Sequence, residues 1–339
     1  MKILVTGSAG FIAGYLIGEL LEHGHKVVGI DNFSKYGKTE KSYDQHPDYQ
    51  FIECNVKDTD VIKDAMGDCD QIVAAAAIIG GISLFHEFAY DLLAENERII
   101  ASTFDAAIWA FKHNKLRKIN VMSSSMVFEN TTTYPTPEGE QLKCPPPFST
   151  YGFQKLSCEY FAKGAWEQYK LPYTIIRPFN CVGIGEKRAL CDKEILSGNV
   201  TLAMSHVVPD LVQKILKGQD PLHILGDGNQ IRHYTYGGDL AEGIRLCIES
   251  EKAINEDFNL STPASTTVLE LSKLIWEKIN GDKPFRYVAD PPFTYDVQKR
   301  VPSVEKAKRV LGFETKTTLD EALDEVIPWI KKQIEIGGI

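Results

Sequence analysis

The chain has 339 residues and a formal net charge of −9, a length that fits one large α/β unit or two lobes. The acidic balance and the absence of a Lys/Arg cluster argue against nucleic acid as the main partner, because binding a phosphate backbone needs a basic face. No stretch approaches the roughly 18 apolar residues that span a bilayer, and residues 1–21 lack the pattern of a signal peptide, so we expect a cytoplasmic protein with no membrane partner.

Residues 1–180 alternate short apolar runs with amphipathic segments. Continuous apolar runs are typical of parallel strands buried on both faces, and the segments between them, such as 11–24 and 91–114, have helical periodicity. This alternation predicts a doubly wound parallel sheet. The apolar runs are KILVTG, KVVGID, QFIEC, QIVAAAA, KINVMSSS and YTIIRPF.

The pattern changes after Phe179. Residues 183–205 combine weak periodicity with mixed polarity. Loops of this length are uncommon unless they are functional or disordered, so we interpret the segment as a substrate-side loop or lid. Short strands are predicted beyond it at HILGDG and FNLS. Helices are predicted near 207–217, 239–250, 268–280, 303–311 and 318–335.

A glycine-rich turn follows the first apolar run and leads directly into a helix. It reads GSAGFIA from Gly7 to Ala13. Glycine permits the tight turn and lets the backbone approach a pyrophosphate, which the N–H groups of a helix N-terminus can bind. The second run ends at Asp31, whose carboxylate suits the ribose hydroxyls of NAD and repels the additional phosphate of NADP. A structural turn with a surface Asp is the alternative, but the combination predicts an NAD site.

Tyr151 and Lys155 are four residues apart, so a helix presents both on one face. An ammonium next to a phenol stabilises the phenolate, and such a Tyr can take the proton of a sugar hydroxyl while NAD takes the hydride. The Lys can also hold the nicotinamide ribose. The run KINVMSSS ends in three serines, at the strand end where ligands bind in parallel sheets. A chance YxxxK pair and a plain strand exit are the alternatives.

Several segments follow one another in a recognisable order. They are TGSAGFIAG, DN at 31–32, DQIVAAAA, SSSMVF, YGFQK, RPFNCVG, GDGNQIRHYTYGGDLAEG and KAKRVLGF. Together they resemble the extended short-chain dehydrogenases/reductases of the nucleotide-sugar epimerase/dehydratase type, over nearly the whole chain. The resemblance implies a Rossmann-type NAD-binding domain at 1–180, to which 236–262 return. It also implies a smaller C-terminal α/β lobe, formed by 181–235 and 263–339, that binds a nucleotide sugar.

The resemblance also implies roles for individual residues. The catalytic Ser or Thr of the family lies three residues before the Val of its V-Y motif, so Val127 selects Ser124, beside Tyr151 and Lys155. The residues implied for NAD are Gly7, Gly10, Phe11, Ile12, Asp31, Asn32, Asn55, Val56, Ala75, Ala76, Ala77, Asn96, Tyr151 and Lys155.

On the substrate side, the resemblance places Asn180 against the diphosphate or the sugar. Arg232 would clamp the diphosphate, a task that suits a planar guanidinium, and Arg300 is a weaker second candidate. The pair Gly80-Gly81 would let the backbone approach the sugar, or would form a plain turn. The residues implied for the substrate are Ser124, Ser125, Met126, Gly80, Gly81, Asn180, Arg232 and Arg300.

Met126 departs from the family in an informative way. Dehydratases of the family have Asp-Glu at the positions of Ser125 and Met126, decarboxylating members have Glu at Met126, and 3,5-epimerising members have Cys there. A thioether has no titratable proton, so Met126 disfavours all three reactions. This leaves 4-epimerisation through a transient 4-keto sugar, on a UDP-hexose, uronic acid or N-acetylhexosamine. A 4-dehydrogenase or an unorthodox dehydratase, and more remotely a non-catalytic NAD-binding regulatory protein, remain alternatives.

Three further expectations concern cysteines, metals and assembly. The seven cysteines are odd in number and form no CxxC pair, so neither a disulfide framework nor a zinc site is expected. The His and acidic residues show no metal-site spacing, and we expect no metal. Helices at 90–113 and 151–169 could pair across a two-fold axis, as in the family, which predicts a homodimer.

The orientation of one acidic residue near the site is left open. Glu129 could point into the site or into solvent.

Overall fold

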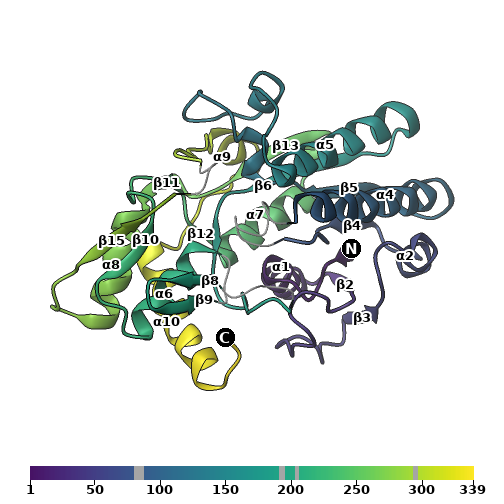
Figure 1. Cartoon of the computed structure of the whole chain (residues 1–339). Helices are drawn as coiled ribbons and strands as arrows, with labels where there is room; N and C mark the ends of the chain where they lie inside the picture. The colour runs from purple at the N-terminus through teal and green to yellow at the C-terminus, as the bar shows by residue number, and fades with distance from the viewer. Residues whose placement is uncertain (80–87, 191–194, 203–205, 293–296) are drawn as a thin grey trace.

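The computed structural model describes residues 1–79, 88–190, 195–202, 206–292 and 297–339. Its central layer is a sheet of seven parallel strands in the order β13-β6-β5-β4-β1-β2-β3 (Figure 1). The predicted doubly wound parallel sheet is therefore confirmed. Because β1 has β2 on one side and β4 on the other, the ligand crevice is expected at the carboxyl ends of β1 and β4. The strands are β1 Lys2–Thr6, β2 Lys26–Asp31, β3 Tyr49–Glu53, β4 Gln71–Ala74, β5 Lys118–Met122, β6 Tyr173–Pro178 and β13 Glu256–Leu260.

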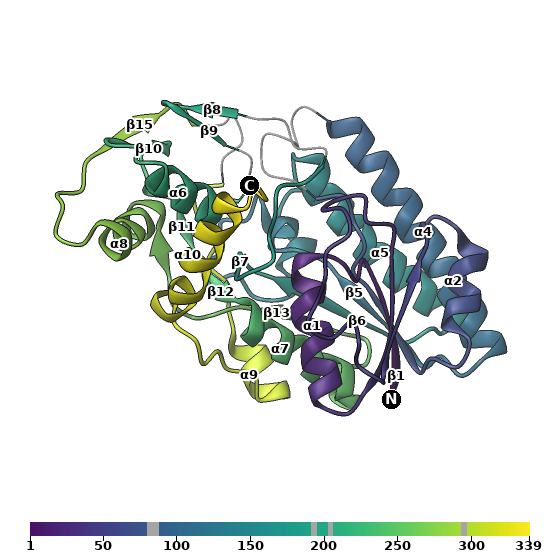
Figure 2. The same cartoon turned by 90° about the horizontal axis from the view of Figure 1, so that it is seen from below.

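Helices cover both faces of this sheet (Figure 2). On one face α1 (Phe11–Glu22) packs against α7 (Gly237–Glu249), and on the other lie α2 (Thr59–Met66), α4 (Ala89–His113) and α5 (Thr150–Tyr169). Successive side chains of a strand point to opposite faces. In β1, Leu4 accordingly belongs to the core under α4 and α5, and Ile3 and Val5 belong to the core under α1 and α7.

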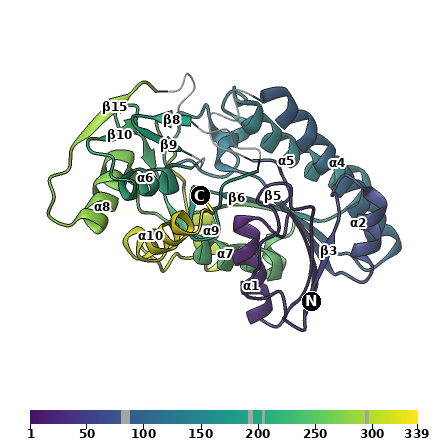
Figure 3. The same ribbon diagram turned by 60° about the horizontal axis from the view of Figure 1, so that its bottom comes forward.

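A third hydrophobic core lies beside the sheet and contains Trp276, which is fully buried. It is formed by α6 (Val207–Leu216), α8 (Val268–Asn280), α10 (Leu319–Glu335) and the parallel pair of β10 (Leu222–Leu225) and β15 (Tyr287–Asp290). Figure 3 shows these elements gathered next to the sheet with its helices α1, α4 and α5. The domain boundaries remain a prediction, although β13, within the returning segment, does lie next to β6 in the sheet.

Residues 183–205 were predicted to be a loop, but they contain a hairpin of β8 (Ile195–Ser197) and β9 (Val200–Leu202). Strands of three residues are too short to produce a visible alternation. The remaining elements are β7 Cys181–Val182, β11 Ile231–Arg232, β12 Thr235–Tyr236, β14 Thr266–Thr267, α9 Glu305–Leu311 and the 3-10 helices η1 Ser125–Phe128, η2 Glu140–Leu142 and η3 Glu251–Ala253. In the part of the chain that the structure describes, no helix combines the length and apolarity needed to cross a membrane.

Candidate active site

A cleft of about 1040 Å³ opens at the carboxyl ends of the central strands and extends to α6, β10 and α10. Sites for one drug-sized ligand measure roughly 300–1,000 Å³, so this cleft is as large as the largest of them. Residues of the turn after β1, such as Gly7, line one end, and Lys214, Leu225 and Val326 line the other. The cleft therefore joins the predicted NAD end to the predicted nucleotide-sugar end.

The glycine-rich turn forms the floor of the cofactor end. Gly7 has φ +71°, and a Cβ there would lie 2.8 Å from the Cα of Ala76. Gly10 is the N-cap of α1 and brings no side-chain acceptor to the first turn of that helix. Backbone N–H groups at a helix N-terminus bind phosphate. The cradle that a Cβ would fill and the open helix start together fit the pyrophosphate of NAD.

Asp31 is held in place at the end of β2. Its carboxylate accepts the N–H of Ala9 at 3.1 Å and the N–H of Phe33 at 2.7 Å, and the residue lines the cleft. A carboxylate has about four lone-pair sites, so the two backbone bonds leave acceptor positions for two ribose hydroxyls. The fixed negative charge also disfavours an additional phosphate at this position.

The segment that follows β4 is fixed by two buried polar side chains. Thr6 Oγ1 accepts the N–H groups of Ala75 and Ala76 at 3.0 and 2.9 Å. The Asn96 amide bonds the N–H and the carbonyl of Ile78 at 2.7 and 3.0 Å. Asn96 was predicted to bind the cofactor, but it is not among the cleft-lining residues, and its bonds give it the task of holding this segment. Thr6 was not predicted, because a strand Thr has no distinctive sequence signal.

Tyr151 and Lys155 lie on α5 and both line the cleft. The N-cap of this helix is Ser149, whose hydroxyl accepts the N–H of Gly152, so the pair falls in the first two turns. Lys155 Nζ lies 6.0 Å from the centroid of the Tyr151 ring and donates to the Met122 carbonyl at 2.9 Å. The ammonium and the phenol are thus side by side at the end of β5.

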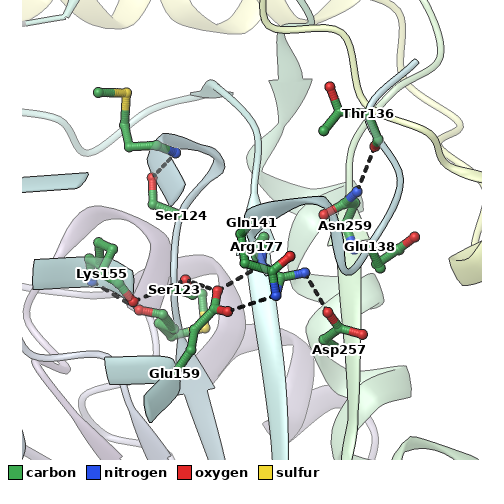
Figure 4. A network of polar contacts seen from close by, with 12 residues as sticks. Ser123, Ser124, Thr136, Glu138, Gln141, Lys155, Glu159, Arg177, Asp257 and Asn259 are labelled. Atoms are coloured by element: carbon green, nitrogen blue, oxygen red, sulfur yellow. Dashed lines mark hydrogen bonds and ion pairs between the residues drawn. The ribbon is translucent and has the colours of Figure 1, made fainter. Parts of the chain in front are cut away.

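The three serines at the end of β5 have different surroundings. Ser123 is buried and lines the cleft, but its hydroxyl donates at 2.7 Å to Glu159 (Figure 4), which does not line the cleft. Ser124 is half-buried, lines the cleft and is the N-cap of η1, where its Oγ accepts the N–H of Met126 at 3.2 Å. Ser125 is buried and also lines the cleft. The structure therefore favours Ser124 as the serine that can reach a substrate next to Tyr151.

The carboxylate of Glu129 binds the start of α5. It accepts the Ser149 hydroxyl at 2.6 Å and the Ser149 N–H at 3.2 Å. Glu129 does line the cleft, but its oxygens are engaged by this helix end. The sequence left open whether this side chain points into the site or into solvent. In the structure its carboxylate points to the start of α5.

The opposite end of the cleft brings the predicted diphosphate residues together. Arg232 lies on β11, and a parallel bridge from Ile231 to Lys299 places Arg300 beside it. Asn180 follows β6 with φ +33°, and its side chain is 3.5 Å from the His233 carbonyl. All three line the cleft. Two guanidinium groups at one end provide the positive charge that a diphosphate needs.

Residues 183–190, here called the strap, connect the two sides of the cofactor end. The Ile184 N–H donates to Tyr15 Oη of α1 at 2.8 Å, and the Leu190 N–H donates to the Lys35 carbonyl at 2.7 Å. Between them, Glu186 is buried and pairs with His206. Burial raises the pKa of Glu186, but His206 and Lys35 outweigh it and hold this pKa below its usual value. No sequence pattern indicated these contacts.

The remaining predicted residues divide into two groups. Gly80 and Gly81 lie outside the described residues. The other residues line the cleft, and their roles in binding remain predictions: Phe11, Ile12, Asn32, Asn55, Val56, Ala77 and Met126.

The parallel sheet, the phosphate cradle and the Tyr-Lys pair define a dinucleotide-dependent enzyme of the hydride-transfer class. A model of the NAD dependent epimerase/dehydratase family matches residues 3–261, and the chain belongs to this family.

Three similar proteins illustrate the relationship. The uncharacterized UDP-glucose epimerase YtcB of Bacillus subtilis is 28% identical, over 97% of this chain and 98% of that protein. The UDP-glucose 4-epimerase of Thermotoga maritima, solved with UDP-glucose, is 28% identical with a TM-score of 0.81, over 98% of this chain and 100% of that chain. The UDP-glucuronic acid 4-epimerase of Bacillus cereus, solved with UDP-glucuronic acid and NAD, is 25% identical with a TM-score of 0.81, over 98% of this chain and 99% of that chain.

These findings confirm the predicted family, the Rossmann-type fold, the enzyme class and NAD as the cofactor. They also agree with the prediction of a nucleotide-sugar epimerase. The individual site residues remain predictions, which the geometry of the cleft supports.

Proposed function

We propose that the chain is an NAD-dependent 4-epimerase of UDP-sugars. Bound NAD would accept the hydride of C4 and later return it. Tyr151 takes the proton of the C4 hydroxyl, Lys155 stabilises the phenolate, and Ser124 bonds the reacting oxygen. The 4-keto sugar then turns over in the cleft, and Tyr151 returns the proton after the opposite face has been reduced. Similar proteins are 4-epimerases of UDP-glucose, UDP-glucuronic acid and UDP-N-acetylglucosamine, so a UDP-linked hexose, uronic acid or N-acetylhexosamine is the expected substrate.

The observation that carries this proposal is which residues line the cleft next to Ser124. Met126 occupies the position where a dehydratase, a decarboxylase or a 3,5-epimerase would need an acid or base, and it is buried against the cleft. The nearest carboxylate along the chain, Glu129, is engaged by Ser149. Epimerisation at C4 needs only Tyr151, Lys155 and a hydrogen-bonding serine. All three line this part of the cleft.

Retention of the cofactor also favours an epimerase over a dehydrogenase. An epimerase reuses its NAD in every turnover, whereas a dehydrogenase must release NADH. The strap is bonded to Tyr15 of α1 and to the carbonyl of Lys35, on both sides of the cofactor end. We therefore expect NAD to remain bound through purification.

The experiment that tests the proposal incubates the protein with UDP-, GDP-, dTDP- and CDP-sugars and follows the products by NMR and mass spectrometry. With a C4-deuterated UDP-sugar, an epimerase yields the C4 epimer at unchanged mass, with its deuterium retained. Transfer of deuterium to released NADH indicates a dehydrogenase, and loss of water or CO₂ indicates a dehydratase or a decarboxylase. If no sugar is converted and Tyr151→Phe behaves like the wild type, the assignment of Tyr151 is wrong.

We further infer that two copies of the chain pair through α4 and α5. These helices pack side by side on the outside of the sheet and expose the aromatic residues Tyr90, Phe153 and Tyr160. Large exposed apolar groups on two neighbouring helices favour an interface. Light scattering after size exclusion should give a dimer for the wild type and a monomer for Tyr160→Glu, with Tyr287→Glu, on exposed β15, as the control. A cytoplasmic location likewise remains a prediction.

A further inference from the structure

One face of α5 extends beyond the catalytic pair. Tyr151, Lys155 and Glu159 are spaced by four residues, so they follow one another along the same side of the helix. The first two line the cleft, whereas Glu159 is fully buried and does not. Figure 4 shows Glu159 beneath Ser123, in a group of polar side chains behind the site.

This face of α5 binds both residues that precede Ser124. Lys155 Nζ donates to the Met122 carbonyl at 2.9 Å, and the Ser123 hydroxyl donates to Glu159 Oε1 at 2.7 Å. Ser124 follows directly and begins η1. The backbone before Ser124 is therefore held by two bonds to the helix that carries Tyr151, together with the bond from the Ser123 N–H to the Ile176 carbonyl of β6 at 2.8 Å.

Arg177 of β6 fixes the orientation of Glu159. Its Nε donates to Glu159 Oε1 at 2.7 Å and its Nη2 donates to Oε2 at 2.8 Å, and Gln141 adds a bond to Oε2 at 3.2 Å. A bidentate pair of this kind fixes direction as well as distance. With both oxygens bonded, the Glu159 carboxylate has one orientation in which it can accept from Ser123.

Arg177 is itself anchored in a buried position. Its side chain is 0% exposed, its Nη1 donates to Asp257 of β13 at 2.7 Å, and its guanidinium lies over the Phe128 ring at 5.2 Å from the centroid. Burial lowers the pKa of Arg177, but the carboxylates of Glu159 and Asp257 outweigh it and raise this pKa above its usual value. The guanidinium stays charged, and α5, β6 and β13 are joined beneath the site.

We propose that Glu159 is a positioning residue that acts through the Ser123 hydroxyl and fixes Ser124 relative to Tyr151. It contacts neither the cleft nor the reacting atoms, so its effect is one of distance and angle. A displacement of about 1 Å in a reacting geometry can lower a rate by about 100-fold. The loss of a single buried hydrogen bond can therefore have a large effect on the rate. The proposal rests on the roles proposed for Ser124 and Tyr151, but not on which sugar nucleotide is turned over.

The first test is Ser123→Ala, which removes the hydroxyl and leaves the pair of Arg177 and Glu159 intact. The matched control is Ser272→Ala, which removes an equally buried hydroxyl, bonded to Val268 at 2.7 Å, from α8. In single turnovers, the absorbance of enzyme-bound NADH reports hydride transfer for any reaction of this class. We expect Ser123→Ala to slow this step by about 10- to 100-fold with KM within about twofold of wild type. A rate equal to that of Ser272→Ala overturns the proposal.

A second test separates action through Ser123 from a general structural role. Glu159→Gln should lower the same rate, and the double variant with Ser123→Ala should be no slower than the slower single variant, because both changes break one linkage. Additive losses would show that Glu159 does not act through Ser123. If Glu159→Gln fails to fold, the comparison of Ser123→Ala with Ser272→Ala decides the question alone.

A third readout needs no substrate. The amides of Met126 and Val127 bond to Ser124 Oγ and to the Ser124 carbonyl, so their hydrogen exchange reports how firmly the turn is held. Exchange at 126–129 should be faster in Ser123→Ala and unchanged in Ser272→Ala. Equal exchange in both variants contradicts the proposal. A wild type that converts no nucleotide sugar contradicts the proposed function instead, and this readout still tests the link from Ser123 to Ser124.

Discussion

Replacing Gly7 by Ala tests the close approach of two backbone segments at the cofactor end. The new Cβ would lie 2.8 Å from the Cα of Ala76 and 3.0 Å from its N, and Gly7 has φ +71°. Gly24 is a matched control, because it has φ +74° and, apart from its chain neighbours, no atom of the described residues lies within 4 Å of an added Cβ. The two variants therefore share a left-handed backbone and differ only in crowding.

The magnitude follows from the same geometry. A left-handed conformation costs a residue with a Cβ roughly 1–2 kcal/mol, and the stiffer unfolded chain offsets about 0.4–1 kcal/mol of this. Gly24→Ala should thus lose about 1 kcal/mol of unfolding free energy or less. Overpacking typically adds about 1–3 kcal/mol, and backbone atoms of Ala76 yield less readily than side chains. Gly7→Ala should therefore lose about 2–4 kcal/mol.

Urea unfolding with and without NAD is the assay. A ligand at 100 times its Kd stabilises the folded state by about 2.7 kcal/mol. This gain should persist in Gly24→Ala and largely disappear in Gly7→Ala, because the shifted Ala76 segment and the turn together form the site proposed for the pyrophosphate. Equal losses of stability in the two variants, with equal gains from NAD, would refute the reasoning.

Three further changes have defined outcomes. Tyr151→Phe removes only the phenol hydroxyl and should slow NAD reduction by about 10²- to 10⁴-fold without changing the NAD content of the purified protein; a rate within twofold of wild type would contradict the proposed acid–base role. Burial lowers the pKa of Lys118 from 10.5 to about 8, so between these pH values the unfolded chain binds more protons than the folded chain. The stability of the wild type should therefore rise with pH in this window, relative to that of Lys118→Met. Parallel urea midpoints for the two proteins across the window would argue against this effect. Tyr15→Phe removes the acceptor of the Ile184 N–H and should speed NAD dissociation about fivefold, because a net hydrogen bond contributes about 1 kcal/mol. The control is Tyr43→Phe, because the buried Tyr43 hydroxyl has no hydrogen-bond partner among the described residues. Identical dissociation rates would exclude a role of the strap.

The sequence was most informative where local pattern decides the structure. Helix α8 spans Val268–Asn280, as its periodicity predicts, because an apolar face and a capping box between Thr267 and Glu270 act together. Strand β15 (Tyr287–Asp290) was missed. Its side chains are mostly exposed, and its partner β10 lies some 65 residues earlier, so neither apolarity nor a nearby turn marks it.

The site shows the same division. The turn at Gly7, the pair of Tyr151 and Lys155 and the serine run are local motifs, and the parallel sheet brings their ends together. The choice among the three serines depends on Glu159, 36 residues after Ser123 in the chain. Asn96 was predicted as a cofactor contact, but which polar side chain faces the cleft and which holds a neighbouring loop is settled by tertiary packing.

The strap has a consequence for the cell in which the enzyme works. Residues 183–190 bond to Tyr15 and to Lys35. In the proposed reaction, the cofactor that they would help to retain returns to its oxidised form at the end of every catalytic cycle. Such an enzyme exchanges no reducing equivalents with the surrounding pool. We therefore expect its flux to be insensitive to the NADH/NAD ratio and to follow the concentrations of the two epimeric sugars alone, in either direction.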